Sequence, residues 1–332
     1  MDKLSVAVIG AGITGLAVGH FLKNFAKVTL FEKSYQAGGR VLTRHALPYS
    51  FDHGAQFFTA KTLAFKAFIA PLISQGVIKP WKADFAEIRH QKIFEKRQWG
   101  LDFPHYVGCP DMYSFSRYLA RSLNIRFNKK IISIKKLNNN WCLRDEIGSI
   151  NSHYDWLILT IPSAQATQII SNEINIINEI SNYQMKSCFS LMLSLKDDVN
   201  IPFQSALVHD EDISWISVNS SKPEREKLLS LVVQSTNQWA DEHIKDQEDQ
   251  VIDYLFDQFN KILNINTKSV VKKDLHLWRY ANIGKSNNRD FLLDEEKKIA
   301  ACGDWLIQGR VEAAFTSGFK LSQFLSDTLR KS

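Results

Sequence analysis

The feature that most constrains the fold of this chain is a short apolar strand, from Val6 to Ile9, that runs directly into closely spaced glycines. The spacing is G-x-G-x-x-G, with glycines at positions 10, 12 and 15. Gly10 permits a tight turn, Gly12 lets the backbone approach a pyrophosphate, and Gly15 lets the next helix pack closely on the strand. The helix N-terminus adds free N–H groups and a partial positive charge. The pattern predicts a dinucleotide-binding βαβ unit.

A second strand, predicted at residues 27–31, ends at Glu32, whose carboxylate can accept both hydroxyls of an adenosine ribose. Strand, helix, second strand and terminal acid are therefore all in the expected order. We expect the dinucleotide to contact Gly10, Ala11, Gly12, Ile13, Thr14, Gly15, Glu32 and Lys33.

The apolar stretch at residues 4–22 also resembles a signal peptide or a membrane span. Four glycines argue against both, because a strand-turn-helix needs them and a spanning helix does not. We therefore predict a cytoplasmic protein. The 332 residues allow two domains, and 45% hydrophobic with 23% charged residues is ordinary for a soluble enzyme.

The formal charge of +6 comes from scattered lysines and arginines, which does not indicate a nucleic-acid surface. The four cysteines form no C-x-x-C pair and the nine histidines have no metal-ligand spacing. We expect reduced thiols and no metal site.

A second glycine pair, Gly38-Gly39, followed by Arg40, comes soon after the acid and favours FAD over NAD alone. The longer cofactor would run past this loop, and Arg40 can neutralise phosphates through two hydrogen bonds. The alternative is a surface turn with a solvated arginine. Further on, Gly54 and Ala55 are the small residues that a backbone needs to lie close against a flat ring, and Gln56 follows them.

Near residue 300 a buried strand is predicted to end at Gly303-Asp304, with a helix from about Val311. Asp304 can accept a hydrogen bond from a ribityl hydroxyl. The helix can direct its positive end at the flavin edge where charge accumulates on reduction. Gly39, Arg40, Gly54, Ala55, Gln56, Gly303, Asp304, Arg310 and Val311 complete the expected cofactor contacts from these segments.

Five motifs together resemble the FAD-dependent amine-oxidase-type superfamily and, within it, the renalase family: G-A-G-I-T-G, F-E-K, G-G-R, D-H-G-A-Q-F-F-T-A and C-G-D-W-L-I-Q-G-R-V-E-A-A-F-T-S-G. The segments S-K-P-E-R at residues 221–225 and T-N-Q-W-A-D-E-H at residues 236–243 strengthen the narrower resemblance. The likeness extends from Val6 to Phe324.

The resemblance implies an α/β fold in which a Rossmann-type FAD domain of the glutathione-reductase kind is interleaved with an α+β substrate domain on a mixed or antiparallel sheet. It places the FAD domain at residues 1–60, 112–162 and 295–332, and the substrate domain at residues 61–111 and 163–294. Ile131 resembles the position whose backbone pairs with adenine. The chain has no second G-x-G-x-x-G, so a nicotinamide substrate must approach the flavin from the substrate domain.

The family oxidises 2- or 6-dihydro isomers of NAD(P) by hydride transfer to flavin N5, and oxygen then yields hydrogen peroxide. The resemblance therefore implies a small-molecule substrate, no catalytic side chain, no membrane and no obligate protein partner. We expect non-covalent FAD, with His53 a packing residue rather than a point of attachment.

By the same resemblance, the substrate side is lined by Phe57, Phe58, Thr59, Ala60, Lys61, Cys188 and Trp305. Trp305 is the preferred aromatic residue for stacking on a nicotinamide or closing the cavity, and core packing is the alternative for Phe57 and Phe58. For each of Lys61, Arg225 and Arg279 we favour a solvated charge, with contact to substrate phosphates as the alternative. Related bacterial members commonly carry Tyr at position 57 and Thr at position 188, so Phe57 and Cys188 put the substrate contacts of this chain in doubt.

Two other classes of function remain open. One is a flavin amine oxidase or a desaturase acting on an apolar substrate, although no amphipathic membrane helix is found. The other is a flavin-binding sensor without turnover, which the residues retained around the expected ring position argue against.

Overall fold

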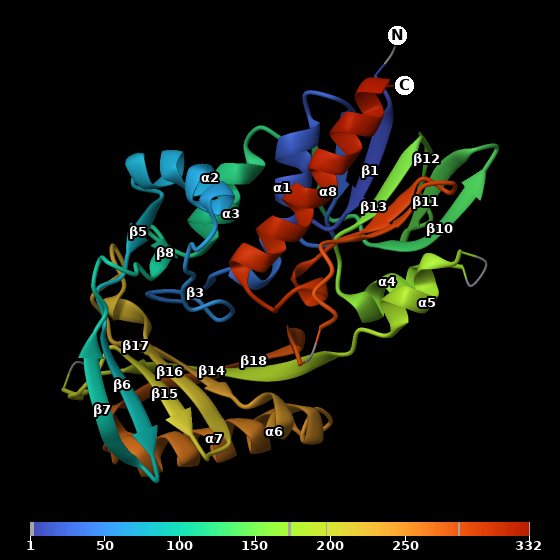
Figure 1. Cartoon of the computed structure of the whole chain (residues 1–332). Coiled ribbons are helices and arrows are strands. Elements are labelled where there is room, and N and C mark those ends of the chain that lie inside the picture. Colours follow the sequence, from blue (N-terminus) through green and yellow to red (C-terminus); the bar gives the residue numbers. More distant parts are fainter. Residues whose placement is uncertain (1–2, 172–173, 197, 285, 332) are drawn as a thin grey trace. The chain divides into compact units, whose positions relative to one another are not determined.

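The computed structural model describes residues 3–171, 174–196, 198–284 and 286–331. The chain forms two compact units, each built from discontinuous segments (Figure 1). Unit 1 comprises Met1–Gly39, Ser116–Met185 and Ile283–Ser332, and unit 2 comprises Arg40–Phe115 and Lys186–Asn282. The units differ in their bounds from the predicted domains: residues 40–60 and 112–115 belong to unit 2, and residues 163–185 and 283–294 belong to unit 1.

Unit 1 is organised around a six-stranded sheet in the order β19-β20-β13-β1-β2-β9. The strands β20, β13, β1, β2 and β9 are parallel, whereas β19 pairs antiparallel with β20. A parallel sheet covered on both faces selects continuous apolar runs, and β1 and β13 are accordingly almost wholly buried. The strand bounds are β1 Ser5–Ile9, β2 Lys27–Phe31, β9 Ile125–Arg126, β13 Trp156–Leu159, β19 Leu292–Asp294 and β20 Ile299–Ala301.

Two helices pack tightly together in unit 1: α1, Ile13–Leu22, and α8, Val311–Lys331. A glycine makes the contact possible. A Cβ added to Gly318 of α8 would lie 2.7 Å from the backbone oxygen of Thr14 in α1, which is closer than side chains come to backbone. The helix that follows the dinucleotide-binding turn is thus held by the last helix of the chain (Figure 1).

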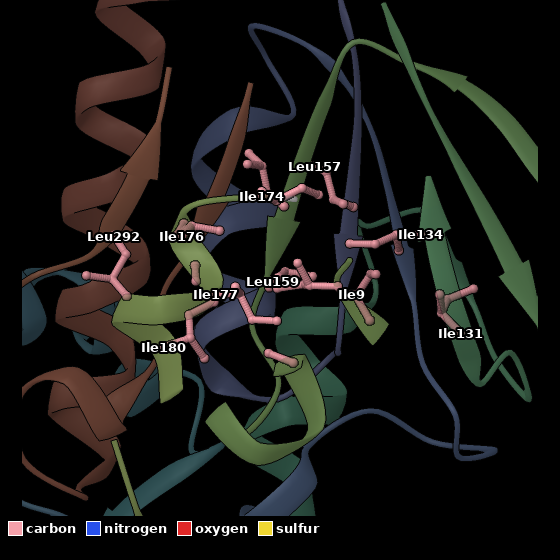
Figure 2. Close-up of a cluster of buried hydrophobic side chains, with 14 of the residues drawn as sticks. Ile9, Ile131, Ile134, Leu157, Leu159, Ile174, Ile176, Ile177, Ile180 and Leu292 are labelled. Atoms are coloured by element: carbon pink, nitrogen blue, oxygen red, sulfur yellow. The ribbon is translucent and has the colours of Figure 1, made fainter. Parts of the chain in front are cut away.

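A second apolar cluster of unit 1 joins its sheet to the three-stranded antiparallel sheet β10-β11-β12 and to the short helices α4 and α5. Figure 2 shows Ile9, Leu157 and Leu159 of the parallel sheet among isoleucines of the α5 region. The bounds are β10 Ile131–Leu137, β11 Asn140–Asp145, β12 Ile150–Tyr154, α4 Ser163–Ile169 and α5 Ile176–Ser181.

Unit 2 is built on a seven-stranded mixed sheet in the order β18-β14-β17-β16-β15-β6-β7. The β15–β6 pair is parallel, and the pairs β14–β17, β17–β16, β16–β15 and β6–β7 are antiparallel. This agrees with the expected mixed or antiparallel substrate-domain sheet. The bounds are β6 Asp84–Arg89, β7 Lys92–Gln98, β14 Met185–Leu195, β15 Ser205–His209, β16 Ile213–Val218, β17 Ser230–Ser235 and β18 Val270–Ile283.

The two faces of this sheet differ in chemistry. One face carries large apolar residues such as Leu191 and Val233, which form a core with helix α7, Glu248–Leu263. The other face carries small hydroxyls, including Ser190, Ser205 and Ser217, all fully buried. These small residues leave room for the 49–58 segment. The segment contacts this face at Ser190, whose Oγ donates to the carbonyl of His53 at 2.7 Å.

The remaining elements are α2 Leu63–Ser74, α3 Tyr113–Ala120, α6 Asn237–Glu242, α7 Glu248–Leu263, β3 Arg44–Ala46, β4 Tyr49–Phe51, β5 Ile78–Pro80 and β8 Tyr106–Gly108, with 3₁₀ turns η1 Gly39–Val41, η2 Asn219–Ser221, η3 Thr267–Ser269 and η4 Asp304–Leu306. Among the described helices, none combines the length and apolarity that crossing a membrane requires.

Candidate cofactor and substrate site

The turn between β1 and α1 has the geometry that its glycines predict. Gly10 has φ +103°, a conformation that side chains disfavour, and its N–H donates to the carbonyl of Phe31 at 2.8 Å. A Cβ on Gly15 would lie 2.1 Å from the carbonyl oxygen of Gly10, so only glycine lets the helix approach the strand. A Cβ on Gly12 would meet nothing within 4 Å, so the space beside Gly12 is open.

Glu32 stands at the end of β2 and is 8% exposed. Its Oε2 accepts a hydrogen bond from the N–H of Ala11 at 2.9 Å, and its Oε1 accepts one from the N–H of Ser34 at 2.9 Å. Each carboxylate oxygen has a second lone pair, so Glu32 can still accept the hydroxyls of a ribose. The acid thus holds the glycine turn and remains able to bind a nucleotide.

Two further segments of unit 1 border this turn. The N–H of Gly38 donates to the carbonyl of Ala11 at 2.8 Å, and the N–H of Lys129 donates to the carbonyl of Glu32 at 2.8 Å. Lys129 lies two residues before Ile131, the first residue of β10. The position expected beside adenine is therefore close in sequence to a residue that hydrogen-bonds the backbone of Glu32. Of the other predicted contacts, Ile13 and Thr14 are buried and Lys33 is exposed.

The β20–α8 segment forms the strand, turn and helix that the sequence predicts, and α8 begins at Val311. The N–H of Gly303 donates to Ser317 Oγ at 2.8 Å, which ties the turn to the helix. Asp304 is 5% exposed within the turn, and Arg310 is exposed just before the helix.

Trp305 disagrees with its predicted role. Its ring is 1% exposed, its Nε1 donates to the carbonyl of Ile161 at 3.2 Å, and it packs edge-on against Tyr183 at 5.1 Å between centroids. A Cβ on Gly303 would come within 2.4 Å of that indole nitrogen, so the ring occupies the space that this glycine leaves. Trp305 is a core residue of unit 1 and offers no open face for stacking.

Unit 1 therefore fits the ADP half of a dinucleotide such as FAD. The open space at Gly12, the N-terminus of α1 behind it and the buried Glu32 carboxylate match what pyrophosphate and ribose require.

In unit 2, the residues 52–56 form a loop held by its own side chains. A Cβ on Gly54 would lie 2.1 Å from the carbonyl oxygen of Arg40, and the N–H of Ala55 donates to the same oxygen at 2.9 Å. Gln56 Nε2 donates to the carbonyls of Asp52 at 2.6 Å and Gly54 at 3.0 Å. Gly54 is thus required by the close approach of the Arg40 backbone, a reason that the sequence does not reveal.

The guanidinium of Arg40 also has a structural partner, because its Nη1 donates to the carbonyl of Ala281 at 2.8 Å. The side chain is half-buried. This contact lies within unit 2 and leaves the predicted interaction with cofactor phosphates as a proposal.

His53 is buried on the same loop and stacks on Trp278, with 5.0 Å between ring centroids and 29° between the planes. Burial, followed by the nearby His276 and Arg44, lowers the pKa of His53 to about 3. Its carbonyl accepts hydrogen bonds from Ser190 and from Trp278 Nε1 at 2.8 Å. These contacts make His53 a neutral packing residue.

Phe57 lies beside a column of stacked rings. Phe85 and Trp99 stack at 5.2 Å, Trp99 and His105 stack at 3.8 Å with planes 5° apart, and Phe57 tilts against both Trp99 and His105 at 4.9 Å. Trp215 of β16 closes the group, 5.5 Å from Phe57. Because Phe57 and Trp215 are only half-buried, the group offers an aromatic surface within unit 2.

The other predicted substrate residues differ in exposure. Phe58 is 4% exposed and packs between Phe65 and Phe115, so it is a core residue and disagrees with the predicted substrate contact. Cys188 is also buried on β14, and burial raises its thiol pKa to about 12. Thr59 and Ala60 are half-buried, and Lys61 is exposed.

Arg279 is exposed on β18, whereas Arg225 is buried and paired with Asp52. Sequence reasoning missed this ion pair and the buried Lys222 that accompanies it. The available signal was the S-K-P-E-R segment, where two cations stand three residues apart, but nothing in the sequence shows that Asp52 meets them.

Comparison with known protein families identifies two matching regions in the chain. Residues 8–71 match the NAD(P)-binding Rossmann-like domain, and residues 83–323 match the model of flavin containing amine oxidoreductases. The chain belongs to the flavin containing amine oxidoreductase family. As a member of that family it is an FAD-dependent oxidoreductase. It is similar to mouse renalase, with 23% identity over 303 residues, which cover 85% of this chain and 86% of that protein.

Two solved structures with a similar fold are flavin oxidases that are named for different substrates. A putative protoporphyrinogen oxidase from Exiguobacterium sp. 255-15 superposes with a TM-score of 0.79 at 10% identity, covering 99% of this chain and all of that one. A redesigned putrescine oxidase superposes with a TM-score of 0.71 at 11% identity, covering both chains fully. At these identities the likeness establishes the fold and leaves the substrate of this oxidoreductase open.

Proposed function

We propose that this flavin-dependent enzyme is an oxidase of the renalase type. It takes a hydride from 2- or 6-dihydro-NAD(P), releases NAD(P)⁺, and passes two electrons and two protons to O₂ to give H₂O₂. The observation that carries this proposal is the similarity to renalase over most of both chains. Bound FAD supplies the hydride acceptor, so the side chains need only bind, orient and exclude water.

Each of the two units has its own binding role in this proposal. Unit 1 binds FAD through the turn at Gly10, Gly12 and Gly15, with Glu32 on the ribose. Unit 2 binds the substrate. The aromatic surface at Phe57 and Trp215 supports this assignment, because a flat pyridine ring gains both burial and stacking on such rings.

We further propose that FAD is held without a covalent bond and that the protein works in the reducing cytoplasm. His53 is turned onto Trp278, and Cys302 is a fully buried thiol in unit 1. All four cysteines are free thiols, as expected in a reducing compartment.

The decisive experiment is anaerobic reduction of the purified yellow enzyme by single reductants. We expect the 2- and 6-dihydro isomers to bleach the flavin band at micromolar concentration, and the ordinary 4-dihydro form, putrescine and benzylamine to leave it unchanged. Admission of air should then restore the band and release one H₂O₂ per substrate oxidised.

Two results would overturn the proposal. Bleaching by an amine alone would assign the chain to the amine oxidases, in keeping with its family name and with the fold of putrescine oxidase. A flavin that no donor reduces would indicate a flavin-binding protein without turnover. Flavin that stays with the acid-precipitated chain would contradict non-covalent binding alone.

A further inference from the structure

The end of β13 contributes a side chain to the glycine turn of unit 1. Thr160 directly follows this strand, and its hydroxyl lies 2.9 Å from the carbonyl oxygens of both Ile9 and Gly10. A hydroxyl carries one proton, so it donates to one of these oxygens at a time. The carbonyl of Ile9 already accepts the backbone N–H of Thr160 at 2.9 Å. The hydroxyl is therefore available to the carbonyl of Gly10.

The peptide group between Gly10 and Ala11 is held at both of its ends. Thr160 donates to its carbonyl oxygen, and its N–H donates to the carboxylate of Glu32 at 2.9 Å. Thr160 and Glu32 follow β13 and β2, which are the two neighbours of β1 in the sheet. Each neighbouring strand thus contributes one polar side chain to the same peptide. Together they fix the orientation of the backbone immediately before Gly12.

Two of the three glycines in the turn make room for the Thr160 hydroxyl. A Cβ on Gly10 would lie 2.9 Å from Thr160 Oγ1, and a Cβ on Gly15 would lie 2.8 Å from the same atom. Side-chain carbons do not approach other atoms this closely without displacing them. The glycine spacing and Thr160 therefore belong to one packing arrangement, although Thr160 stands 150 residues after Gly10.

The end of β13 is also held by contacts that do not involve this hydroxyl. The carbonyl of Leu159 accepts the N–H of Cys302 at 2.9 Å, and the carbonyl of Ile161 accepts Trp305 Nε1 at 3.2 Å. The strand pairs with β1 on one side and β20 on the other. Loss of the hydroxyl alone should therefore leave β13 in place and affect the turn.

We propose that Thr160 is a positioning residue for the pyrophosphate of FAD. Its hydroxyl orients the Gly10–Ala11 peptide and so fixes the turn in which the open space at Gly12 and the N-terminus of α1 receive the phosphates. This inference rests on the proposed function in one respect, the binding of FAD at this turn. It adds the end of a third strand to a site otherwise defined by β1, α1 and Glu32.

The test is a fluorescence titration of the apoprotein with FAD in wild type, Thr160→Val, Thr160→Ser and the control Thr167→Val. Valine keeps the shape of threonine without the donor, whereas serine keeps the donor. Thr167 is also half-buried in unit 1, and its hydroxyl donates to the carbonyl of Ala164 at 3.1 Å within α4. Its substitution therefore removes a comparable hydrogen bond away from the turn.

We expect Thr160→Val to weaken FAD binding about fivefold, the effect of one lost hydrogen bond. Thr160→Ser and Thr167→Val should stay within about twofold of wild type. The apoproteins of Thr160→Val and Thr167→Val should melt at the same temperature, because each loses one hydroxyl contact. A fall in FAD affinity without a matching fall in melting temperature separates positioning from a general structural role.

Two smaller probes locate the effect within the cofactor. ADP carries the pyrophosphate and adenosine does not, so Thr160→Val should weaken ADP binding about as much as FAD binding and leave adenosine binding unchanged. An equal loss for adenosine would overturn the proposal, because it would assign Thr160 to the nucleoside part of the site or to the stability of unit 1.

Other results would also contradict the role of Thr160. Wild-type FAD affinity in Thr160→Val would overturn it, as would a loss that Thr160→Ser does not restore. If Thr160→Val does not fold, Thr160→Cys, which leaves a weak donor of similar size, takes its place, and unchanged affinity there would overturn the proposal. Because no reductant is used, reduction of the flavin by an amine would contradict the proposed function and leave this result standing. A wild-type protein that binds no FAD would end both.

Discussion

The carboxylate of Glu32 accepts the N–H of Ala11 at 2.9 Å, so the acid at the end of the second strand also braces the glycine turn at the end of the first. One side chain thereby joins two parts of the expected nucleotide site before any nucleotide binds. Replacement of this acid should affect both the turn and the affinity for the cofactor.

We expect Glu32→Gln to weaken FAD binding about tenfold, about 1.4 kcal/mol, because a neutral amide accepts ribose hydroxyls less strongly than a carboxylate. Titration of the apoprotein with FAD, followed by flavin fluorescence, measures this change. Tyr35→Ser, which alters a ring that is 75% exposed, is the matched control. Equal affinity in Glu32→Gln and the control would contradict the role of Glu32.

Substituting alanine for two glycines of the same turn should affect different properties: FAD affinity at Gly12 and stability at Gly15. Gly12→Ala places a methyl group in open space, so the apoprotein should keep its melting temperature but bind FAD at least tenfold more weakly. Gly15→Ala forces a methyl group against the Gly10 carbonyl and should cost about 1 to 3 kcal/mol of stability or more. Thermal melts and FAD titrations of both apoproteins measure these effects. Normal FAD affinity in Gly12→Ala would contradict the binding of the pyrophosphate beside Gly12.

Removing Asp52 should destabilise the fold strongly, since it leaves two buried cations without their counter-charge. We expect Asp52→Asn to lower the free energy of unfolding by about 3 to 5 kcal/mol. Glu224→Gln, which breaks an exposed ion pair with Lys79, should cost less than about 1 kcal/mol. Urea unfolding at pH 7 compares the two variants, and similar losses in both would show that the buried ion pairs of Asp52 with Lys222 and Arg225 contribute little to stability.

The stability of the protein should fall as the pH falls from about 6.5 toward 4. The folded-state pKa of His53 is lowered to about 3, mainly by burial, so the unfolded chain takes up a proton that the folded chain does not. At pH 5 this difference amounts to about 2 kcal/mol for His53. His276, with a pKa lowered to about 4, acts in the same direction.

Urea unfolding at pH 7 and pH 5 should therefore show a smaller pH dependence in His53→Phe, which keeps a ring on Trp278 and removes the titrating group. The same slope in both proteins would mean that His53 is protonated in the folded state.

The adjacent residues Phe57 and Phe58 should separate substrate binding from stability. Phe57→Ala removes a half-buried ring from the aromatic surface and should lower kcat/KM about tenfold. Phe58→Ala empties a buried site between Phe65 and Phe115 and should cost about 3 to 5 kcal/mol of stability. A stability loss in Phe57→Ala with unchanged kcat/KM would place Phe57 in the core.

Much of unit 1 was predictable because its signals are local. The glycine spacing, the acid at the end of β2 and the helix beginning at Val311 all depend on neighbouring residues, and the structure has them where the sequence indicates. The flavin family was predictable for the same reason, since its motifs lie at the two ends of the chain.

The errors concern contacts between residues far apart in the sequence. Trp305 was expected to face a substrate, but its surroundings are set by Ile161 and Tyr183. Arg225 was treated as a surface or phosphate-binding charge, although Asp52, 173 residues earlier, holds it inside. No periodicity or spacing in one sequence encodes which distant carboxylate meets which cation.

The packing of Gly318 against Thr14 has a consequence for the order of events during synthesis. The flank of α1 that Gly318 approaches stays uncovered until α8, far along the sequence, has been made, and β13 gains its partner β20 only shortly before. We therefore expect a product that ends before α8 to contain the fingerprint glycines but to lack the helix that covers α1.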